Sequence, residues 1–423
     1  MKITFITGHL CKERHALLNE LALDLGEYGA EVTVLTGFPS RRISDEVRQY
    51  YLAHPREQIS KNVVVRRIGS KRGEGTGLFE RMIKYVFLTR KLYKEAKKIP
   101  TDAYYIYSSP PFLGYMGCKL AKKAPTLYNA QDLFPDTLVH MKHISNQNPL
   151  IRWFRYKERQ AYQKNTRIVT ISEDMKKTIV KAGCDESKID VIYNWADTAG
   201  LRYVAKKDNA LMDELKIDKR KFIISYAGDI GLFQGWDVMI DAAKILKDKH
   251  PEILFAFIGS GSYKERLLQR VEQEHLSNIQ VLPLQPASRL SEIYSIGDVE
   301  LVPIEKGITK MALPSKTGVI MSVGSAILAL VDHGSEIERI ICDHNVGVAL
   351  EHGSAQRLAD AILYCYEHRD SLETWRTNAR NFALENYSRK SQTKKYYAIL
   401  KSIAENAPCG KRGKNEHREN HGE

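Results

Sequence analysis

Two long runs of alternating elements constrain the fold of this chain more than any other feature of its sequence. Short apolar segments rich in Val and Ile, typical of buried strands, alternate with longer segments that carry apolar residues at helical spacing. The alternation runs from Lys2 to Tyr193, pauses over a polar stretch, and restarts at Phe222. Because parallel strands need a crossover between them, this pattern predicts an α/β fold with two doubly wound parallel sheets.

The length of 423 residues allows two domains with separate cores. We place the divisions where the alternation stops and restarts. The expected parts are an N-terminal domain over 1–197, a linker over 198–220, a C-terminal domain over 221–385, a helix over 386–404 that could return to the N-terminal domain, and a disordered polar tail over 405–423.

The net charge of +13 is unevenly distributed along the sequence. Residues 1–200 contain 33 Lys and Arg against 21 Asp and Glu, a balance of +12, whereas residues 201–423 contain 31 against 30, a balance of +1. The excess predicts an anionic partner for the first domain, with membrane lipid, polyphosphate and nucleic acid as candidates.

Cysteine usage and hydropathy exclude several classes of protein. The six cysteines form no CxxC pair or Cys/His cluster, which argues against structural zinc and fits a reducing compartment. Lys2 leads directly into a strand, and no apolar run approaches the ~20 residues of a membrane span. We therefore expect a cytoplasmic protein with no signal peptide and no membrane span.

The stretch from Asp298 to Glu338 reads as strand, loop, helix and strand, with polar residues at the strand ends. Pro314 suits the first turn of the helix, and Ser315 and Lys316 stand beside it. In an open parallel sheet this edge binds ligands, and a helix N-terminus with a lysine suits a diphosphate. Taken alone, the stretch is explained more simply as an ordinary βαβ unit with a solvated lysine.

Two glycine-marked turns precede this stretch, and each follows a strand and opens a helix. They read YAGDIGLFQGWD over 226–237 and FIGSGS over 257–262. Neither has the GxGxxG spacing of a dinucleotide-binding turn. Three such turns on one predicted sheet edge are more specific than any one of them, because glycine lets the backbone approach a ligand closely.

At these turns the sequence resembles retaining GT-B glycosyltransferases of family 4. The resemblance covers roughly residues 1–400 and is strongest to bacterial transferases of capsule, colanic acid and O-antigen synthesis, of the fucosamine-transferase type. It is carried in the second half by YAGDIG, FIGSGS, LVPIE and PSK, and in the first half by GEYGAEVTVLTGFPS (26–40), YSSPPFLG (107–114), NAQDLFPD (129–136), VTISEDM (169–175) and VIYNWAD (191–197).

The resemblance implies that the second domain binds a nucleoside diphosphate sugar, with UDP favoured over GDP. Lys316 would neutralise the diphosphate and stabilise it as a leaving group, without a metal or other cofactor. Glu336 would accept hydrogen bonds from the ribose, although a helix N-terminal glutamate favoured by the dipole explains it equally well. The donor-binding residues are expected to be Gly228, Gly231, Gly259, Gly261, Ser315, Lys316 and Glu336.

In the first domain Asp132 follows a predicted strand and is expected to face the acceptor. It could orient or deprotonate an acceptor hydroxyl, and its alternative role is an N-cap or Asx turn. His9, Arg14 and Asn194 are further candidates for the acceptor-side cleft. A surface arginine and a turn asparagine are the competing interpretations of the last two.

The sequence departs from the family pattern in three places. Met311 and Val319 stand where the family usually has two glutamates, and Gln234 replaces a usual basic residue in the first glycine turn. GHLCKERH over 8–15 replaces a usual Gly-Gly. If the PSK form is a feature of the nearest subgroup, Lys316 takes over the role of the missing basic residue; otherwise the chain lacks that basic residue at the donor site.

Two basic segments of the first domain predict binding at an anionic membrane surface. Residues 61–98 carry 12 Lys and Arg against 3 Asp and Glu, around an apolar stripe from Leu78 to Phe87. Residues 153–164 repeat the mixture of aromatic and basic residues. A core-packed helix with a solvated basic face is the alternative. The lipid-linked acceptors of the family favour the membrane, and no nucleic-acid-binding motif is present.

The leading interpretation is a transferase that moves a sugar to a lipid-linked saccharide at the inner face of the cell membrane. A sugar-nucleotide epimerase would share the fold but should carry a cluster of acidic and histidine residues in the first domain, which we do not find. A non-catalytic scaffold subunit would fit the missing glutamates. A nucleic-acid-binding module would fit only the charge.

Overall fold

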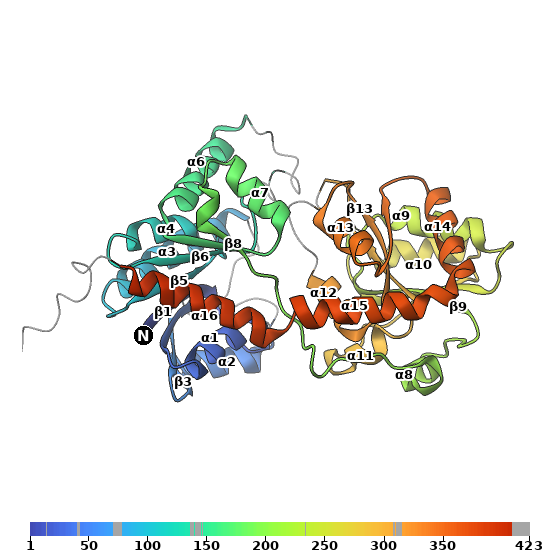
Figure 1. Ribbon diagram of the computed structural model, residues 1–423, viewed down its shortest axis with the longest axis horizontal. Helices are drawn as coiled ribbons and strands as arrows, with labels where there is room; N and C mark the ends of the chain where they lie inside the picture. Colours follow the sequence, from blue (N-terminus) through green and yellow to red (C-terminus); the bar gives the residue numbers. More distant parts are fainter. Residues whose placement is uncertain are drawn as a thin grey trace, which may run out of the picture. The chain divides into compact units, whose positions relative to one another are not determined.

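The computed structural model describes residues 1–13, 15–39, 43–70, 78–135, 139, 145, 147–232, 234–307, 309 and 315–407, without the side chains of residues 78, 79, 81 and 315. The chain forms two compact units (Figure 1). The first contains Met1–Tyr193 and the chain from Lys390 onward, and the second contains Asn194–Arg389.

The first unit contains an eight-stranded sheet of order β3-β4-β2-β1-β5-β6-β7-β8. β3 is antiparallel to β4, and all the other pairs are parallel. The chain starts in the middle of the sheet, moves to one side, and then crosses to β5, so the direction of winding switches between β1 and β5. The strands are β1 (Lys2–His9), β2 (Glu31–Gly37), β3 (Arg56–Ser60), β4 (Val63–Ile68), β5 (Ala103–Tyr107), β6 (Thr126–Ala130), β7 (Arg167–Thr170) and β8 (Ile189–Val191).

Helices accompany this sheet, and the last one comes from the end of the chain. They are α1 (Ala16–Glu27), α2 (Asp45–Ala53), α3 (Leu78–Ala96), α4 (Leu113–Leu120), α6 (Pro149–Lys164), α7 (Glu173–Lys181) and α16 (Arg389–Glu405), with a 3-10 turn over Glu186–Lys188. α16 is attached by polar contacts: Tyr28 and Thr393 share a hydrogen bond of 3.0 Å between their hydroxyls, and Asn129 Nδ2 donates to Tyr396 Oη at 3.0 Å.

The second unit contains a six-stranded parallel sheet of order β11-β10-β9-β12-β13-β14. This is the 3-2-1-4-5-6 order of a Rossmann sheet, and its switch point lies between β9 and β12. The strands are β9 (Phe222–Asp229), β10 (Ile253–Ser260), β11 (Ile279–Leu282), β12 (Val299–Pro303), β13 (Ala326–Val331) and β14 (Gly347–Glu351). The helices are α8 (Ala210–Glu214), α9 (Trp236–Leu246), α10 (Lys264–Gln273), α11 (Leu290–Ile293), α12 (Ser315–Val323), α13 (Glu336–Asp343), α14 (Ala355–Glu367) and α15 (Leu372–Asn386), with 3-10 turns over Lys206–Asp208, Ala287–Arg289 and Arg369–Ser371.

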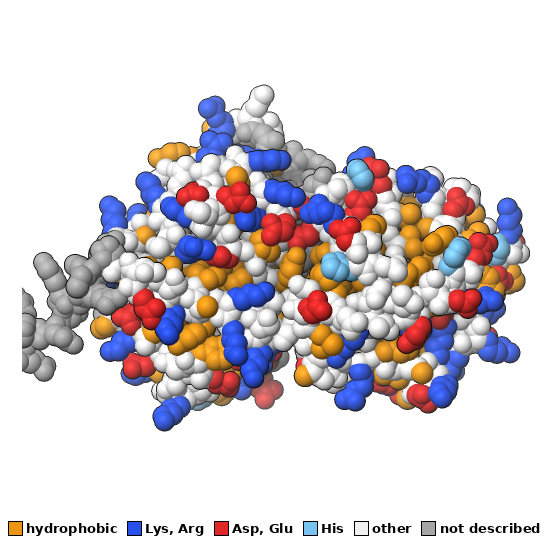
Figure 2. Space-filling view, viewed as in Figure 1, with side chains coloured by type: hydrophobic (Ala, Val, Ile, Leu, Met, Phe, Trp, Pro, Cys, Tyr) orange, Lys and Arg blue, Asp and Glu red, His pale blue; other side chains and the backbone are white. Residues whose placement is uncertain are grey.

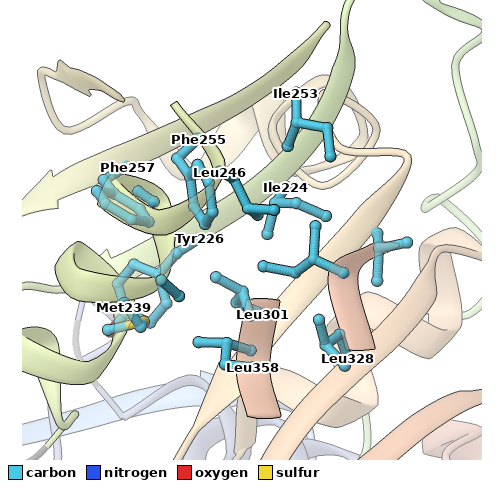
Figure 3. Close-up of a cluster of buried hydrophobic side chains, with 14 of the residues drawn as sticks. Ile224, Tyr226, Met239, Leu246, Ile253, Phe255, Phe257, Leu301, Leu328 and Leu358 are labelled. Carbon is cyan, nitrogen blue, oxygen red and sulfur yellow. The ribbon is translucent and has the colours of Figure 1, made fainter. Parts of the chain in front are cut away.

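The core of the second unit explains why its strands read as continuous apolar runs. Helices cover both faces of a parallel sheet, so both faces of each strand are buried. Ile224 and Phe255 from the strands pack with Met239 and Leu246 of α9 and with Leu358 of α14 (Figure 3).

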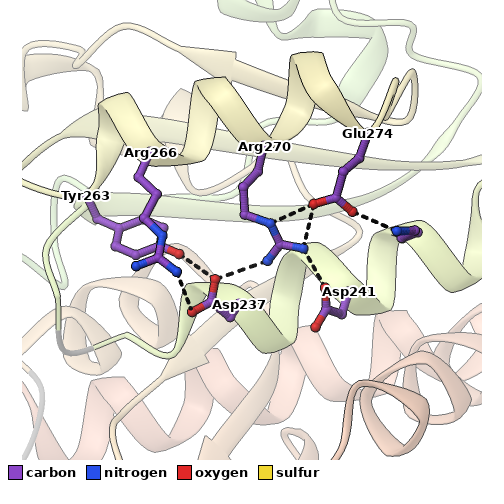
Figure 4. Close-up of polar contacts among 7 residues, drawn as sticks. Asp237, Asp241, Tyr263, Arg266, Arg270 and Glu274 are labelled. Atoms are coloured by element: carbon purple, nitrogen blue, oxygen red, sulfur yellow. Dashed lines mark hydrogen bonds and ion pairs between the residues drawn. The ribbon is translucent and has the colours of Figure 1, made fainter.

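An ion-pair network fixes α10 against α9 on the surface of the second unit (Figure 4). The Arg270 guanidinium lies 3.0 Å from Asp237, 2.7 Å from Asp241 and 2.7 Å from Glu274. Tyr263 donates its hydroxyl to Asp237 at 2.6 Å. Because α9 begins directly after the first glycine turn, this network also holds the base of that turn.

The structure adds elements that the hydropathy pattern did not predict. α2 and β3 lie in a stretch left unassigned; β3 reads REQIS, is polar, and lies antiparallel at the edge of its sheet. The stretch 198–220, expected as a linker, is packed into the second unit. There Lys206 pairs with Asp298, and Leu211 and Met212 are buried.

Candidate functional site

The carboxyl ends of β9 and β10 bring the two glycine turns side by side. The two strands run in register to their last residues, so that Gly228 lies opposite Gly259 and Asp229 opposite Ser260. Gly228 has a φ of 146°, a conformation that side chains disfavour. Both turns lie on the sheet edge where ligands bind in doubly wound folds.

Backbone packing between the turns accounts for two of the predicted glycines. A Cβ on Gly259 would lie 2.0 Å from the carbonyl oxygen of Gly228, and a Cβ on Gly261 would lie 2.4 Å from the carbonyl group of Ile230. The Ile230 N–H donates to the Ser260 carbonyl at 3.0 Å. Gly259 and Gly261 are therefore required by the fold itself, and ligand contact by them stays a prediction.

The loop between β9 and α9 is anchored at both ends. Trp236 donates its indole N–H to the Gly231 carbonyl at 2.8 Å, and Tyr226 donates its hydroxyl to the Asp229 carbonyl at 2.7 Å. At Gly231 a Cβ would meet only side chains, the nearest being the Asp229 carboxylate at 2.6 Å. Backbone packing constrains Gly231 less than Gly259. Close approach of a ligand therefore explains a glycine at position 231 better than packing does.

Lys316 lies in the first turn of α12, directly beside the first glycine turn. Its Nζ is 3.9 Å from the centre of the Tyr226 ring, and the hydroxyl of that ring donates to the Asp229 carbonyl in the turn. Ser315 begins α12, and its side chain is not among those described; Pro314 and Met311 lie outside the described residues. Through Tyr226, Lys316 is linked to the glycine turn that ends β9, at the switch point between β9 and β12.

Glu300 is a charged residue of this site that the sequence patterns did not single out. It lies within β12, is fully buried, and accepts a hydrogen bond from Ser225 Oγ on β9. Its Oε2 has no hydrogen-bond partner among the described residues. The only signal in the sequence is a carboxylate inside an otherwise apolar strand, which costs free energy unless it has a partner.

Burial shifts the protonation of Glu300 and Lys316 in opposite directions. It raises the pKa of Glu300 to about 7 and lowers the pKa of Lys316 to about 7, while the charge of each favours the charged form of the other. The amine therefore lies close to its protonation midpoint at neutral pH. An anion bound beside it would favour the charged form.

Glu336 is the first residue of α13 and is 5% exposed. Two other residues cap this helix: Ser335 accepts from the Glu338 N–H at 3.4 Å, and Glu338 accepts from the Gly334 N–H at 2.5 Å. Burial raises the pKa of Tyr387, and the charge of Glu336 adds to this effect. Glu336 is therefore a buried carboxylate near Tyr387, and its contact with ribose stays a prediction.

Further polar residues follow the neighbouring strands at the same edge. Asp332 follows β13 and accepts from the Gly307 N–H at 2.9 Å, which holds the loop that follows β12. His352 follows β14, and burial lowers its pKa while the charge of Asp332 raises it. Glu305 Oε2 and His352 Nε2 are buried without a hydrogen-bond partner in the described part of the chain. Sequence analysis singled out neither Glu305 nor His352.

In the first unit, Asp132 lines a cavity of about 260 Å³ at the carboxyl edge of the sheet. It follows β6, and desolvation raises its pKa above the ordinary value. The other lining residues include the serines that follow β5 and a group of aromatic side chains from α4 and its N-cap, from β6 and the loop after it, and from α6: Ser108, Ser109, Phe112, Tyr115, Tyr128, Phe134 and Phe154. A carboxylate among aromatic rings can both position and deprotonate a hydroxyl.

The other predicted acceptor residues do not join Asp132 in this cavity. His9 ends β1 and lines a separate cavity of about 360 Å³ together with Phe38, Tyr85 and Leu88. Asn194 begins the second unit, and Arg14 lies outside the described residues. The structure therefore does not assemble these candidates into one site within the first unit.

Two negative findings concern the described residues alone. None of their His, Cys, Asp and Glu side chains form a group of three that could hold a metal ion. Among the helices that the structure describes, none combines the length and apolar character needed to cross a bilayer.

Comparisons with known proteins identify both halves of the chain. Residues 16–199 match the model of Glycosyltransferase Family 4, and residues 207–382 match that of Glycosyl transferases group 1. The first half therefore resembles family 4 glycosyltransferases, and the second half resembles group 1 glycosyl transferases. Both matches are consistent with the resemblance drawn from the sequence motifs; the fucosamine-transferase type stays a prediction.

Two curated relatives of this chain come from bacterial sources. WcaI of Escherichia coli (strain K12), named as a colanic acid biosynthesis glycosyl transferase, is 31% identical over 194 residues, 46% of this chain and 47% of WcaI. WbjE of Pseudomonas aeruginosa, named as a glycosyltransferase, is 26% identical over 216 residues, 51% of this chain and 53% of WbjE. The matches span about half the length of these relatives.

Solved structures confirm the predicted GT-B fold class of two Rossmann-like doubly wound domains. Anabaena Alr3699/HepE in complex with UDP and glucose superimposes with a TM-score of 0.68 at 16% identity, over 95% of this chain and 100% of that one. Sucrose-phosphate synthase from Thermosynechococcus elongatus gives a TM-score of 0.75 at 13% identity, over 95% and 99%.

Proposed function

We propose that this family 4-type chain is a retaining glycosyltransferase of bacterial surface polysaccharide synthesis. It moves a sugar from a nucleoside diphosphate, with UDP as the favoured base, to a lipid-linked saccharide. One observation carries the donor assignment: Lys316 lies at the switch point of the second sheet, over the Tyr226 ring and beside the Gly228 turn. The fucosaminyl or other N-acetylhexosaminyl class of donor sugar is part of the proposal.

In the second unit the diphosphate lies against the first glycine turn and Lys316. The bond between the anomeric carbon and the diphosphate oxygen breaks, and Lys316 stabilises the charge that develops on that oxygen. Gly228 and Gly231 leave room for the phosphates, and Glu336 accepts hydrogen bonds from the ribose. UDP in complex with the HepE fold neighbour supports this choice of nucleotide.

In the first unit the acceptor saccharide occupies the cavity at Asp132. Asp132 accepts the proton of the attacking hydroxyl, and the new glycosidic bond forms on the face of the sugar that the diphosphate leaves, so that the anomeric configuration is retained. Desolvation raises the pKa of Asp132, so its carboxylate is a stronger base than that of an ordinary aspartate. The aromatic rings around it pack against the apolar faces of a sugar.

Residues 61–98 and 153–164 hold the protein at an anionic membrane surface, at the inner face of the cell membrane. On α3, Ile83 and Phe87 are 41% and 58% exposed, and on α6 Trp153 and Tyr156 are 46% and 56% exposed. Leu92 and Ala96, a turn or more further along α3, are fully buried. The apolar stripe predicted for α3 is thus exposed at its centre, as an interfacial helix requires.

A transfer assay tests the proposed reaction. The purified chain is incubated with labelled UDP-sugars or GDP-sugars and with bacterial lipid extract, and the label is measured in the organic phase. Label in the lipid from a UDP-sugar supports the proposal. Label converted to another free sugar nucleotide without acceptor would favour an epimerase, and no conversion of any donor would favour a scaffold subunit.

A flotation assay tests the membrane assignment separately. Binding to vesicles that contain an anionic phospholipid, and not to vesicles of neutral phospholipid alone, is expected. Equal binding to both would overturn the electrostatic part of the proposal. The control is the same experiment at high salt, which should release the protein.

A further inference from the structure

A second cavity of the first unit adjoins the one that contains Asp132. It has a volume of about 350 Å³ and lies between α3, α4 and α6. We call it the trough. Its lining is mostly apolar or aromatic, with cationic groups among it: Val86, Thr89, Arg90, Tyr93, Phe112, Tyr115, Met116, Lys119, Trp153 and Lys157. Phe112, Tyr115 and Lys157 also line the Asp132 cavity, so the two cavities share a wall.

Two lysines stand around the aromatic ring at this shared wall. The Nζ of Lys157 is 4.2 Å from the centre of the Tyr115 ring, and the Nζ of Lys119 is 5.4 Å from the same centre. In the described chain neither ammonium group has a carboxylate within ion-pair distance, whereas many lysines elsewhere do. Two ammonium groups that share one ring and lack counter-charges suit an anionic ligand.

The trough lining includes one exposed aromatic side chain. Trp153 of α6 lines the trough while 46% exposed, whereas the exposed Phe87 of α3 lines the separate cavity at His9. In Figure 2, apolar and basic side chains adjoin at the edge of the first unit where Figure 1 places α6. A hydrocarbon chain could leave the trough over Trp153 and enter a bilayer.

The geometry points to a binding site for a lipid diphosphate, with the hydrocarbon in the trough and the phosphates between Lys119 and Lys157. A saccharide attached to the diphosphate would then continue into the adjoining cavity and reach Asp132. The order of the apolar trough, the lysines in its wall and the adjoining cavity with Asp132 matches the order of lipid, phosphate and sugar in one molecule. This inference rests on the proposed function for the role of that saccharide as acceptor.

Calorimetry with farnesyl diphosphate and the full chain tests the site without any transfer reaction. We expect binding at one site, with inorganic diphosphate bound at least about tenfold more weakly because it lacks the chain. A Lys119→Ala, Lys157→Ala double variant should bind farnesyl diphosphate roughly 10- to 100-fold more weakly. A Lys122→Ala, Lys164→Ala double variant is the matched control, since both of these lysines are exposed nearby and line neither cavity.

A second variant separates the hydrocarbon from the phosphates. Val86→Trp fills the trough, so it should weaken farnesyl diphosphate binding and leave inorganic diphosphate binding unchanged. Circular dichroism and the thermal midpoint establish that this variant is folded. If it does not fold, Val86→Asp, which makes the trough wall polar, replaces it in the same comparison.

Several outcomes would overturn the site. They are an equal loss of affinity in the control double variant, equal affinity for inorganic diphosphate, or no binding of farnesyl diphosphate at all. Complete loss in Lys316→Ala would place the ligand in the second unit instead. If the trough variants behave as expected while the transfer assay fails, the lipid diphosphate site stands and the proposed reaction falls.

Discussion

The two sheets share the order of their central parallel strands and differ in what surrounds their switch points. In the second unit the edge between β9 and β12 is formed by backbone turns, one lysine and one buried carboxylate. In the first unit the edge near β5 and β6 is surrounded by aromatic side chains that leave cavities of about 260 and 350 Å³. The fold sets where a ligand can bind, and the side chains set which ligand it is.

The lysines of the two regions also differ in their surroundings. Lys316 lies over the Tyr226 ring; burial lowers its pKa and the charge of the buried Glu300 raises it, so its charge depends on its surroundings. Lys119 and Lys157 have no carboxylate partner in the described residues; both line the trough, and Lys157 also lines the Asp132 cavity. The first arrangement suits a group whose charge changes during a reaction, and the second suits a permanently charged ligand.

Replacement of Lys316 should have the largest effect on the donor side. Lys316→Ala removes the cation beside the leaving diphosphate, and we expect transfer to fall roughly 10²- to 10³-fold. UDP affinity, measured by calorimetry, should fall with it. Lys249→Ala is the control, because Lys249 is exposed on the same unit and has no ion pair within the described chain. Unchanged UDP affinity in Lys316→Ala would contradict the diphosphate assignment.

Replacement of Asp132 should reduce transfer without changing donor binding. Asp132→Asn keeps the size of the side chain and removes the base, so we expect transfer to fall about 10²-fold while UDP affinity stays the same. The activity of the unaltered protein should also fall on acidification at a pH above the ordinary aspartate pKa, because desolvation raises the pKa of Asp132.

Asp45→Asn is the control for this change, since Asp45 is exposed in the first turn of α2. A loss of UDP affinity in Asp132→Asn equal to its loss of transfer would contradict the division of roles between the units.

Sequence patterning predicted the two doubly wound sheets because buried parallel strands are continuous apolar runs. It missed β3, which is polar and lies at a sheet edge, and Glu300, because a single residue inside a strand carries no periodic signal. Lys119 was not predicted, and Lys157 was predicted only as part of the basic segment 153–164, because only the packing of α4 against α6 brings the two lysines to one ring. Such sites arise from tertiary contacts, which local patterns do not encode.

Alanine substitutions in the glycine turns can show whether each glycine is needed for packing or for the close approach of a ligand. Gly259→Ala should destabilise the protein by about 1–3 kcal/mol, because the new Cβ would lie 2.0 Å from the Gly228 carbonyl oxygen. Gly353→Ala should be nearly neutral, since its Cβ would meet only the flexible Arg357 side chain. Denaturant unfolding measures both. Gly231→Ala should instead reduce UDP affinity more than stability, and the opposite result would assign Gly231 to packing.

Glu300 should have the smallest effect, a shift in pH dependence. The pKa of Lys316 is lowered to about 7, so UDP affinity should decline as the pH rises through this value and the amine loses its proton. Because the Glu300 charge favours the protonated amine, Glu300→Gln should move the decline to lower pH and weaken UDP binding several-fold at neutral pH. Lys316→Arg, whose guanidinium stays charged, should abolish the decline. If UDP affinity in Glu300→Gln declined at a higher pH instead, the ionised Glu300 carboxylate would be repelling the diphosphate and not supporting the charge of Lys316. The donor site would then differ from the Lys119 and Lys157 site by a repulsive carboxylate.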